Sequence, residues 1–258
     1  ITEITSDTKG TEVVMTSTND TTGAVKVTKY TVKVDKTKPT VGELVINGTK
    51  GNNGWYTSDV TFSVKNGSDS MSGHSKTTSS ITSITKDTTG TKVVVTTKDK
   101  AGNTATKEYT VKVDKTKPTV GELVISGTKG DNGWYKSNVT FSVTAGSDST
   151  SGHASTTSSI TSITKDTKGT KVVVTTKDKA GNTSTKEYTV KMDKTAPIPG
   201  TLTISGTKGL GEWYLSDVTL TVNNGSDSTS GHASTTSTHT RVVGNTSGTE
   251  VTVTTKDN

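Results

Sequence analysis

One short module recurs along this chain at a fixed step, and this recurrence constrains the fold more than any other feature. The pair Trp-Tyr stands at 55–56, 134–135 and 213–214, so each copy begins 79 positions after the one before it. Asp-Lys-Thr-Lys-Pro occurs at 35–39 and 114–118, and returns as Asp-Lys-Thr-Ala-Pro at 193–197. Self-similarity at a fixed step indicates an array of one small module. Such repetition favours an extended structure or multivalent binding over catalysis, because a reaction rarely needs the same unit three times in a row.

The proline-bearing stretches mark the module boundaries, because proline ends strand pairing and stiffens a linker. They predict modules at 35–113 and 114–192, and a third at 193–258 that is truncated before its last strand. Residues 1–34 match the C-terminal part of a module, since Ile1–Ile4 resembles Ile81–Ile84 and Tyr30–Val34 repeats Tyr109–Val113. We therefore interpret the sequence as an excerpt from a longer polypeptide.

Composition limits the classes of function. Only 26% of the residues are hydrophobic and 4% are aromatic, and there is no cysteine, so each module builds a thin core without disulfides or zinc–thiolate sites. The net charge of +6 comes from lysines scattered along alternating segments, with a single arginine. Nucleic-acid binding favours clustered basic residues interleaved with aromatics, so we expect no nucleic-acid partner. Lysine on solvated strand faces explains the charge.

Alternation of apolar and polar residues predicts strands and no helices. Val60–Val64 reads Val-Thr-Phe-Ser-Val, and its copies stand at 139–143 and 218–222. Further strands are predicted at 44–46, 81–84, 92–97 and 108–113, with a turn at Asp99–Asn103 between the last two. Roughly seven short strands per module are typical of a two-sheet sandwich. In the Val60–Val64 strand and its copies we expect threonine and serine on the wet face, and we expect Trp55 to cap one end of the core.

These motifs carry a family resemblance. Gly-Trp-Tyr-x-Ser-Asp-Val-Thr, Ser-Asp-x-x-Ser-Gly, Gly-Thr-x-Val-x-Val and Asp-Lys-Ala-Gly-Asn, spaced as here, resemble the bacterial Ig-like repeats of long cell-surface and adhesin proteins, including OmpL47-type repeats and Gram-positive surface domains. The resemblance implies an all-β fold of tandem 79-residue Ig-like β-sandwich modules, arranged as beads on a string. It implies no catalytic residues.

A hydrolase is the alternative that the histidines raise. The motif Ser-Asp-Ser-x-Ser-Gly-His places Asp69 near His74, Asp148 near His153 and Asp227 near His232. A Ser-His-Asp triad also needs a rigid nucleophile elbow and an oxyanion hole, and the sequence supplies neither. A loop stabilised by aspartate and serine is the simpler interpretation, so we expect no enzyme and no catalytic residues.

Calcium is the one cofactor that the sequence leaves open. Three aspartates lie at the module junctions, and two more lie in loops that could point towards a junction; oxygen ligands of this kind suit Ca²⁺. The candidate ligands are Asp35, Asp114, Asp193, Asp99 and Asp178. No Asp-x-Asp-x-Asp motif exists and the net charge is positive, which favours a chain without a cofactor. A Lys–Asn isopeptide bond is a further alternative, but no buried Lys–Asn pair with an acid stands out.

The expected function is a non-catalytic stalk segment of a bacterial extracellular surface protein or adhesin, which projects a distal binding domain. Two alternatives remain: the modules form the wall of an assembled appendage or filament, or each module binds glycan or matrix weakly through Trp-Tyr. The expected partners are neighbouring modules of the same chain, other copies in a filament, and host matrix or glycan reached through domains outside this segment. We expect the bacterial cell surface or a secreted location, with no membrane insertion here.

Overall fold

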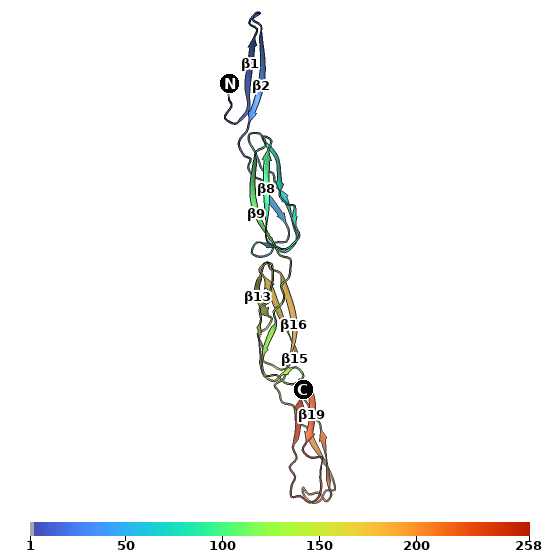
Figure 1. Cartoon of the computed structure of the whole chain (residues 1–258). Coiled ribbons are helices and arrows are strands. Elements are labelled where there is room, and N and C mark those ends of the chain that lie inside the picture. Colours follow the sequence, from blue (N-terminus) through green and yellow to red (C-terminus); the bar gives the residue numbers. More distant parts are fainter. Residues whose placement is uncertain (1–2) are drawn as a thin grey trace. The chain divides into compact units, whose positions relative to one another are not determined.

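The computed structural model describes residues 3–258, and over that range the chain forms strands and no helix (Figure 1). Residues 1–2, which carry part of the match between Ile1–Ile4 and Ile81–Ile84, lie outside the described residues. The chain divides into two compact units. One holds the chain up to Pro118 with the loops Asp148–His153 and Asp178–Asn182; the other holds Thr119–Ser147, Ala154–Lys177 and Thr183–Asn258.

The strand pattern repeats in step with the sequence, which confirms the all-β fold of tandem modules. An N-terminal hairpin, which we define as residues 3–34, precedes modules 35–113, 114–192 and 193–258, called here the first, second and third. The hairpin consists of β1 (Thr8–Thr18) and β2 (Val25–Val34). The first module contains β3 (Leu44–Asn47), β4 (Trp55–Tyr56), β5 (Val60–Val64), β6 (His74–Ser79), β7 (Ser83–Ile84), β8 (Thr88–Asp99) and β9 (Thr104–Val113).

The second module repeats these seven strands. They are β10 (Leu123–Ser126), β11 (Trp134–Tyr135), β12 (Val139–Val143), β13 (His153–Ser158), β14 (Ser162–Ile163), β15 (Thr167–Asp178) and β16 (Thr183–Met192). The third module contains five: β17 (Thr201–Ser205), β18 (Val218–Asn223), β19 (His232–Ser237), β20 (Arg241–Val242) and β21 (Val253–Asp257).

Two sheets build each of the first two modules. In the first, β3-β5-β7 forms one sheet and β4-β9-β8-β6 the other; the second repeats the order as β10-β12-β14 and β11-β16-β15-β13. In the first module the pairs β3–β5, β5–β7, β6–β8 and β8–β9 are antiparallel, as are β10–β12, β12–β14 and β15–β16 in the second. The short pairs β4–β9 and β11–β16 are parallel, so that Trp-Tyr runs parallel to the end of the last long strand.

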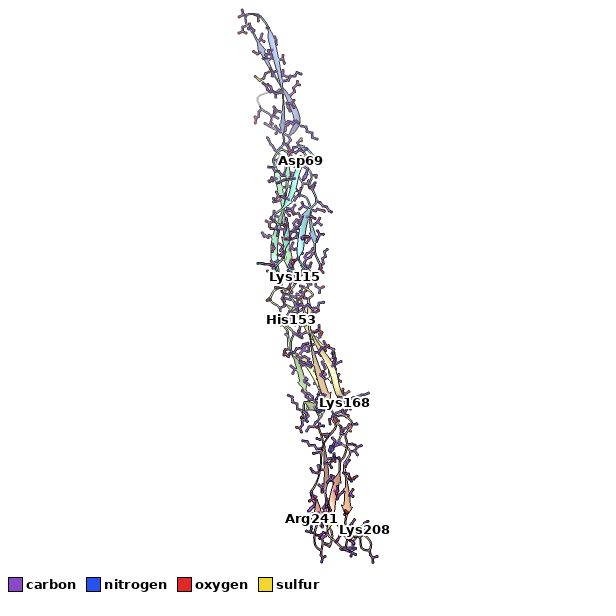
Figure 2. The ribbon with its side chains drawn as sticks, turned by 90° about the vertical axis from the view of Figure 1, so that its right-hand side faces the viewer. Asp69, Lys115, His153, Lys168, Lys208 and Arg241 are labelled. Carbon is purple, nitrogen blue, oxygen red and sulfur yellow. The ribbon has the colours of Figure 1, made fainter. Side chains whose placement is uncertain are left out.

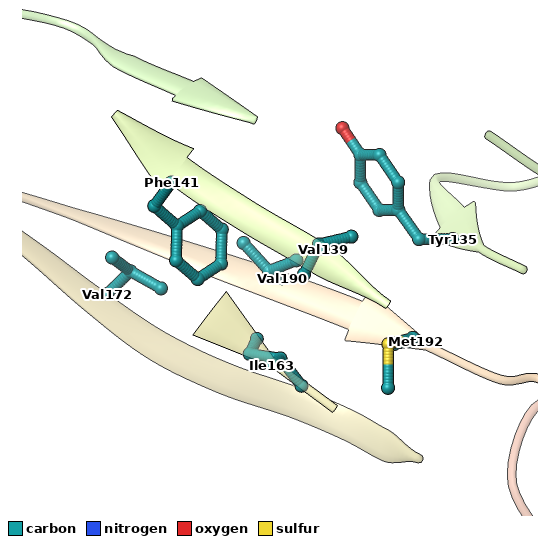
Figure 3. Close-up of a cluster of buried hydrophobic side chains, with 7 residues drawn as sticks. All are labelled: Tyr135, Val139, Phe141, Ile163, Val172, Val190 and Met192. Carbon is teal, nitrogen blue, oxygen red and sulfur yellow. The ribbon is translucent and has the colours of Figure 1, made fainter. Parts of the chain in front are cut away.

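The core lies between the two sheets, as the alternation predicts. In the first module Val60, Phe62 and Ile84 of one sheet meet Val93, Val111 and Val113 of the other. The second module repeats the arrangement, and Figure 3 shows a cluster of its buried side chains: Tyr135, Val139, Phe141, Ile163, Val172, Val190 and Met192. Trp55 and Trp134 are buried as well.

Thr61 and Ser63 are exposed, as the alternation of their strand predicts, but two local features were not predicted. Thr97 and Thr176 lie on strands and are fully buried. Their hydroxyls accept hydrogen bonds from the backbone N–H groups of Gly42 and Gly121, and these contacts offset the loss of water. The polar strand β6, His74–Ser79, was not predicted because it has no apolar alternation; it forms the edge of the sheet beside β8.

Candidate metal centre

One aspartate begins each module and anchors the linker. Asp114 accepts a hydrogen bond at Oδ1 from the Thr116 N–H (3.1 Å), and at Oδ2 from the Ser151 N–H (3.0 Å). The same pair of contacts recurs at Asp35 with Thr37 and Ser72, and at Asp193 with Thr195 and Ser230. The carboxylate thus connects the linker to the loop that leads into the histidine strand.

A second aspartate organises that loop. Asp148 Oδ1 accepts the backbone N–H groups of Thr150, Ser151 and Gly152 at 2.9–3.0 Å. Gly152 has a φ of 85°, which lets the chain curl around the carboxylate. The other oxygen, Asp148 Oδ2, is buried and has no hydrogen-bond partner among the described residues. A buried oxygen without a donor is unfavourable unless a proton or a cation neutralises it.

A third aspartate is the last residue of the long strand: Asp99 in β8 and Asp178 in β15. Asp178 accepts the N–H groups of Gly181 (2.6 Å) and Asn182 (2.8 Å), and its second oxygen accepts Asn182 Nδ2 (2.8 Å). Asn182 Nδ2 also donates to the carbonyl of Asp114 at 3.0 Å. This confirms the predicted turn, and it explains why an Asp-Lys-Ala-Gly-Asn sequence stands here: asparagine binds the turn and the linker together.

These aspartates meet in three carboxylate clusters, one at an end of each module. In every cluster one oxygen of each aspartate lies within 4.8 Å of the others; the clusters are Asp35/Asp69/Asp99, Asp114/Asp148/Asp178 and Asp193/Asp227/Asp257. Figure 2 shows the end at which Asp69 lies, opposite the end of the first module that carries Lys115. Asp114 and Asp178 are completely buried.

Burial and hydrogen bonding shift the pKa values of aspartates in the first and second clusters in different directions. Burial is the main reason why the pKa of Asp114 is raised, and the nearby Asp148 carboxylate raises it further, against hydrogen bonds from Ser151. Asp99 differs: burial again disfavours its charge, but hydrogen bonds from Asn103 and Gly102 outweigh burial and hold its pKa below the usual value. Burial therefore makes the negative charge of Asp114 less favourable than that of Asp99.

The dimensions of the clusters suit a hard cation. Ca²⁺ binds six to eight oxygens at about 2.3–2.6 Å, so two of its ligands lie at most about 5 Å apart. Three carboxylate oxygens within 4.8 Å meet that limit. The remaining ligands would be backbone carbonyls or water. Asp148, a member of the second cluster, is also the residue with a buried carboxylate oxygen that has no hydrogen-bond partner among residues 3–258.

All five aspartates that the sequence singled out lie in these clusters. Sequence reasoning missed Asp69, Asp148 and Asp227 as ligands, because it assigned them to the loop beside the histidine, and it missed Asp257. Their recurrence at the 79-residue step, in step with the junction aspartates, was the signal that could have identified them. Local spacing could not, since Asp35 and Asp99 are 64 positions apart.

The residues of the hydrolase alternative do not form a triad in the first module. His74 Nε2 is hydrogen-bonded to Thr77 Oγ1 (2.9 Å), while the Asp69 carboxylate accepts from backbone N–H groups and weakly from Ser72 Oγ (3.4 Å). Thr77 Oγ1 in turn contacts Thr97 Oγ1 at 3.0 Å. The histidine therefore joins a threonine network inside the sheet.

A polar clamp holds the linker at the opposite end of each complete module. Asp87 accepts the N–H of Lys115 (2.9 Å) and the hydroxyl of Thr116 (2.5 Å), and Lys115 Nζ reaches Asp59. The next linker repeats this with Asp166, Lys194 and Thr195. There Lys194 Nζ donates to Asn138 Oδ1 at 2.8 Å, but this Lys–Asn pair is exposed, unlike the buried pair that an isopeptide bond needs.

The first unit also contains a contact between two loops from successive repeats. The N–H of Asn52 donates to the carbonyl of Ala180 (2.7 Å), and Asn53 Nδ2 donates to the carbonyl of Lys179 (2.9 Å). Asn53 adopts a positive φ of 51°, which asparagine tolerates better than most residues. The contact buries Ala180, whereas its counterpart Ala101 is exposed.

No protein-family model matches the chain, and no curated protein shows significant similarity to it. Within residues 3–258 there is no helix of the length and apolarity needed to cross a membrane.

Proposed function

We propose that this chain is a non-catalytic stalk segment of a bacterial extracellular surface protein or adhesin, built from Ig-like modules, that holds a binding domain away from the cell. The observation that carries the proposal is the repetition of the junction contacts. Each junction uses the same aspartate, Asp114 or Asp193, and the same clamp, Asp87 or Asp166. The same polar contacts recur at each linker, and they limit how far the chain bends there. A stalk needs such limited bending, whereas a flexible tether does not.

A display experiment tests this function. The 258-residue chain is placed between an outer-surface anchor and a small binding domain on a bacterium, and capture of ligand-coated beads is counted. A Gly/Ser linker of equal residue number is the control. The proposal expects the chain to support more capture than the flexible linker, because a chain of folded modules keeps the domain clear of the envelope. Equal capture by both would contradict it.

A second candidate function is binding of calcium at the carboxylate clusters, which would stiffen the junctions. The buried and unpartnered Asp148 Oδ2, beside two completely buried aspartates, favours it. Isothermal titration with Ca²⁺ at pH 7 tests it, with Mg²⁺ as the competing ion. A triple variant D69N/D148N/D227N should lose the binding, while the exposed D20N should keep it. No heat above dilution for the native chain would reject calcium.

Weak glycan binding through Trp-Tyr finds less support. It requires an exposed aromatic patch in every module, and Trp55 and Trp134 are buried. Each lies below a lysine ammonium, with Lys112 Nζ 5.2 Å and Lys191 Nζ 5.4 Å from the ring centroid. In these two modules the face of the indole is therefore covered.

A further inference from the structure

The loop at residues 51–54 presents an Asn-Gly sequence at the centre of an exposed turn. Asn53 and Gly54 both have positive φ, 51° and 76°, and the N–H of Trp55 donates to the carbonyl of Asn52 at 3.0 Å. These values describe a tight turn in which Asn-Gly occupies the two central positions. Both residues are exposed. Asparagine is chemically labile, and a following glycine, which has no Cβ, leaves its side chain open to attack by the backbone.

The reaction open to such a sequence is deamidation. The backbone nitrogen of Gly54 loses its proton and forms a bond to Cγ of Asn53, while the bond from Cγ to the side-chain nitrogen breaks. That nitrogen takes up the proton and leaves as ammonia, so that a cyclic succinimide remains. Water then opens the ring to aspartate or to isoaspartate, in which the backbone runs through the side chain. Water is the only co-reactant, and the step involves no oxidation or reduction.

Hydrogen bonding distinguishes this turn from two other Asn-Gly sequences of the chain. The N–H of Gly54 has no hydrogen-bond partner among the described residues. In the Asn66-Gly67 sequence the glycine N–H donates to Thr77 Oγ1 at 3.0 Å, and the pair at 224–225 makes the same contact with its own threonine. A nitrogen whose proton is held by a hydroxyl oxygen must give up that hydrogen bond before it attacks. The nitrogen of Gly54 is free of this restraint.

A lysine ammonium favours the attack at Asn53. Lys112 Nζ donates to the carbonyl oxygen of Asn53 at 3.2 Å. When the nitrogen of Gly54 loses its proton, the negative charge is shared with that oxygen, because both atoms belong to the same peptide group. A positive charge at hydrogen-bonding distance stabilises this anion. The turn therefore combines a free attacking nitrogen with a cation placed where the charge develops.

The side chain that reacts is also the one that binds the loop at 179–181, which belongs to the same compact unit. Asn53 Nδ2 donates to the carbonyl of Lys179 at 2.9 Å, beside the hydrogen bond from the N–H of Asn52 to the carbonyl of Ala180. An ionised aspartate has only acceptor oxygens, and these repel a carbonyl oxygen. Isoaspartate in addition lengthens the backbone of the turn. Either product loses the hydrogen bond to Lys179.

We propose that Asn53 is a site of spontaneous deamidation, and that its conversion irreversibly releases the contact between the loops 51–54 and 179–181. This inference does not depend on the stalk function. While the contact is closed, the hydrogen bond to Lys179 holds the side-chain amide and slows the attack. Each opening of the contact allows the nitrogen of Gly54 to reach Cγ. Because ammonia is lost, a loop that has reacted does not close as before, and the contact weakens as the protein ages.

Incubation of the full chain at mildly alkaline pH, followed by peptide mass mapping, tests the site. We expect Asn53 to gain the mass of an amide-to-acid conversion and to become a substrate for an isoaspartate methyltransferase. Asn66 and Asn224 should convert more slowly in the folded chain, whereas in urea all three should convert at similar rates. An intact Asn53 in the folded chain would overturn the proposal. Equal rates for the three residues in the folded chain would overturn it as well.

Two glycine variants test whether the loop contact controls the rate. In G51A the added Cβ would clash with the carbonyl of Ala180, so the contact should open and Asn53 should convert faster than in the native chain. G130A changes the equivalent glycine of the second module and is the matched control, because it leaves the loop at 51–54 intact. An unchanged rate at Asn53 in G51A would overturn the protective role of the contact.

The variant N53D tests the consequence without ageing. Aspartate tolerates a positive φ as asparagine does, so the turn itself should persist. Exchange of the Asn52 amide should become about 2- to 13-fold faster, the factor that corresponds to one lost hydrogen bond, and the aged native chain should show the same change. N132D, at the same turn position of the second module, should leave the Asn52 amide unchanged. Equal protection of that amide in N53D and the native chain would overturn the release, and an equal effect of N132D would overturn its local cause.

Discussion

Replacing Asp148 by asparagine should stabilise the loop that it organises when no divalent cation is present. Asparagine keeps one oxygen to accept the N–H groups of Thr150, Ser151 and Gly152. Its amide nitrogen would take the place of the buried Oδ2, which has no partner, and would remove one negative charge from the cluster with Asp114 and Asp178. An unsatisfied buried polar atom costs about 1–3 kcal/mol. D148N should recover an amount of that order.

Amide hydrogen exchange followed by NMR measures this effect at the site. A gain of about 1–3 kcal/mol corresponds to a roughly 5- to 150-fold slower exchange of the Thr150, Ser151 and Gly152 amides in chelator. The exposed variant D20N is the control and should change nothing there. If calcium binds the cluster, adding it should slow exchange in the native chain and have little effect in D148N.

The pH dependence provides a second check on the same substitution. Burial, and then the charge of Asp148, raise the pKa of Asp114 in the folded chain. A raised carboxyl pKa means that stability is lost as pH rises from about 3.8 through the folded pKa. D148N should reduce this loss. Faster exchange in D148N than in the native chain, in chelator at pH 7, would refute the assignment of Oδ2 as unsatisfied.

Three other predictions concern the core, the loop contact and the linker clamp. M192A should reduce the free energy of unfolding by about 2–5 kcal/mol in urea titrations, because Met192 is fully buried, whereas M15A at a 61% exposed position should change it by less than about 0.5 kcal/mol. G51A should speed amide exchange in the loop that it contacts, because its Cβ would clash with the backbone carbonyl of Ala180. At Gly130 an added Cβ would meet Cγ and Cδ of the Lys136 side chain at 3.0 and 3.2 Å, and the nearest backbone atom is 3.5 Å away, so G130A should have a smaller effect. Asp166 has a lowered pKa, chiefly through a threonine hydroxyl, so the clamp should be intact above pH 3.8 and lost as pH falls through the lower folded pKa, which carboxyl chemical shifts would report.

The sandwich was predictable because its strands alternate with period two. Val60 and Phe62 follow the pattern, and both are in the core. The buried Thr97 was not predictable in this way, since threonine on a strand normally faces water, and its burial depends on the N–H of Gly42, 55 positions away. Whether a threonine is buried therefore depends on contacts with residues far away in the sequence, which local alternation does not reveal.

The candidate site was predictable in part for a similar reason. Asp114 stands beside a proline linker, and Asp178 stands in a turn motif, so local sequence indicates both. Asp148 has an equally clear local role, because one of its oxygens organises its own loop. Local sequence did not indicate that its second oxygen is buried without a hydrogen-bond partner. The meeting of the three carboxylates depends on strand order, which alternation does not determine.

The parallel pairing of Trp-Tyr with the end of the last strand has a mechanical consequence. In the first module Trp55 and Tyr56 run parallel to Lys112 and Val113, and the N–H of Asp114 donates to the carbonyl of Tyr56 (2.8 Å) just where the chain leaves. Tension on the chain acts along this strand, across hydrogen bonds that lie transverse to it. The bonds of the β8–β9 ladder would therefore share the load in shear, instead of breaking one at a time as in a peeled hairpin. A module of low apolar content can in this way resist force better than its small core suggests.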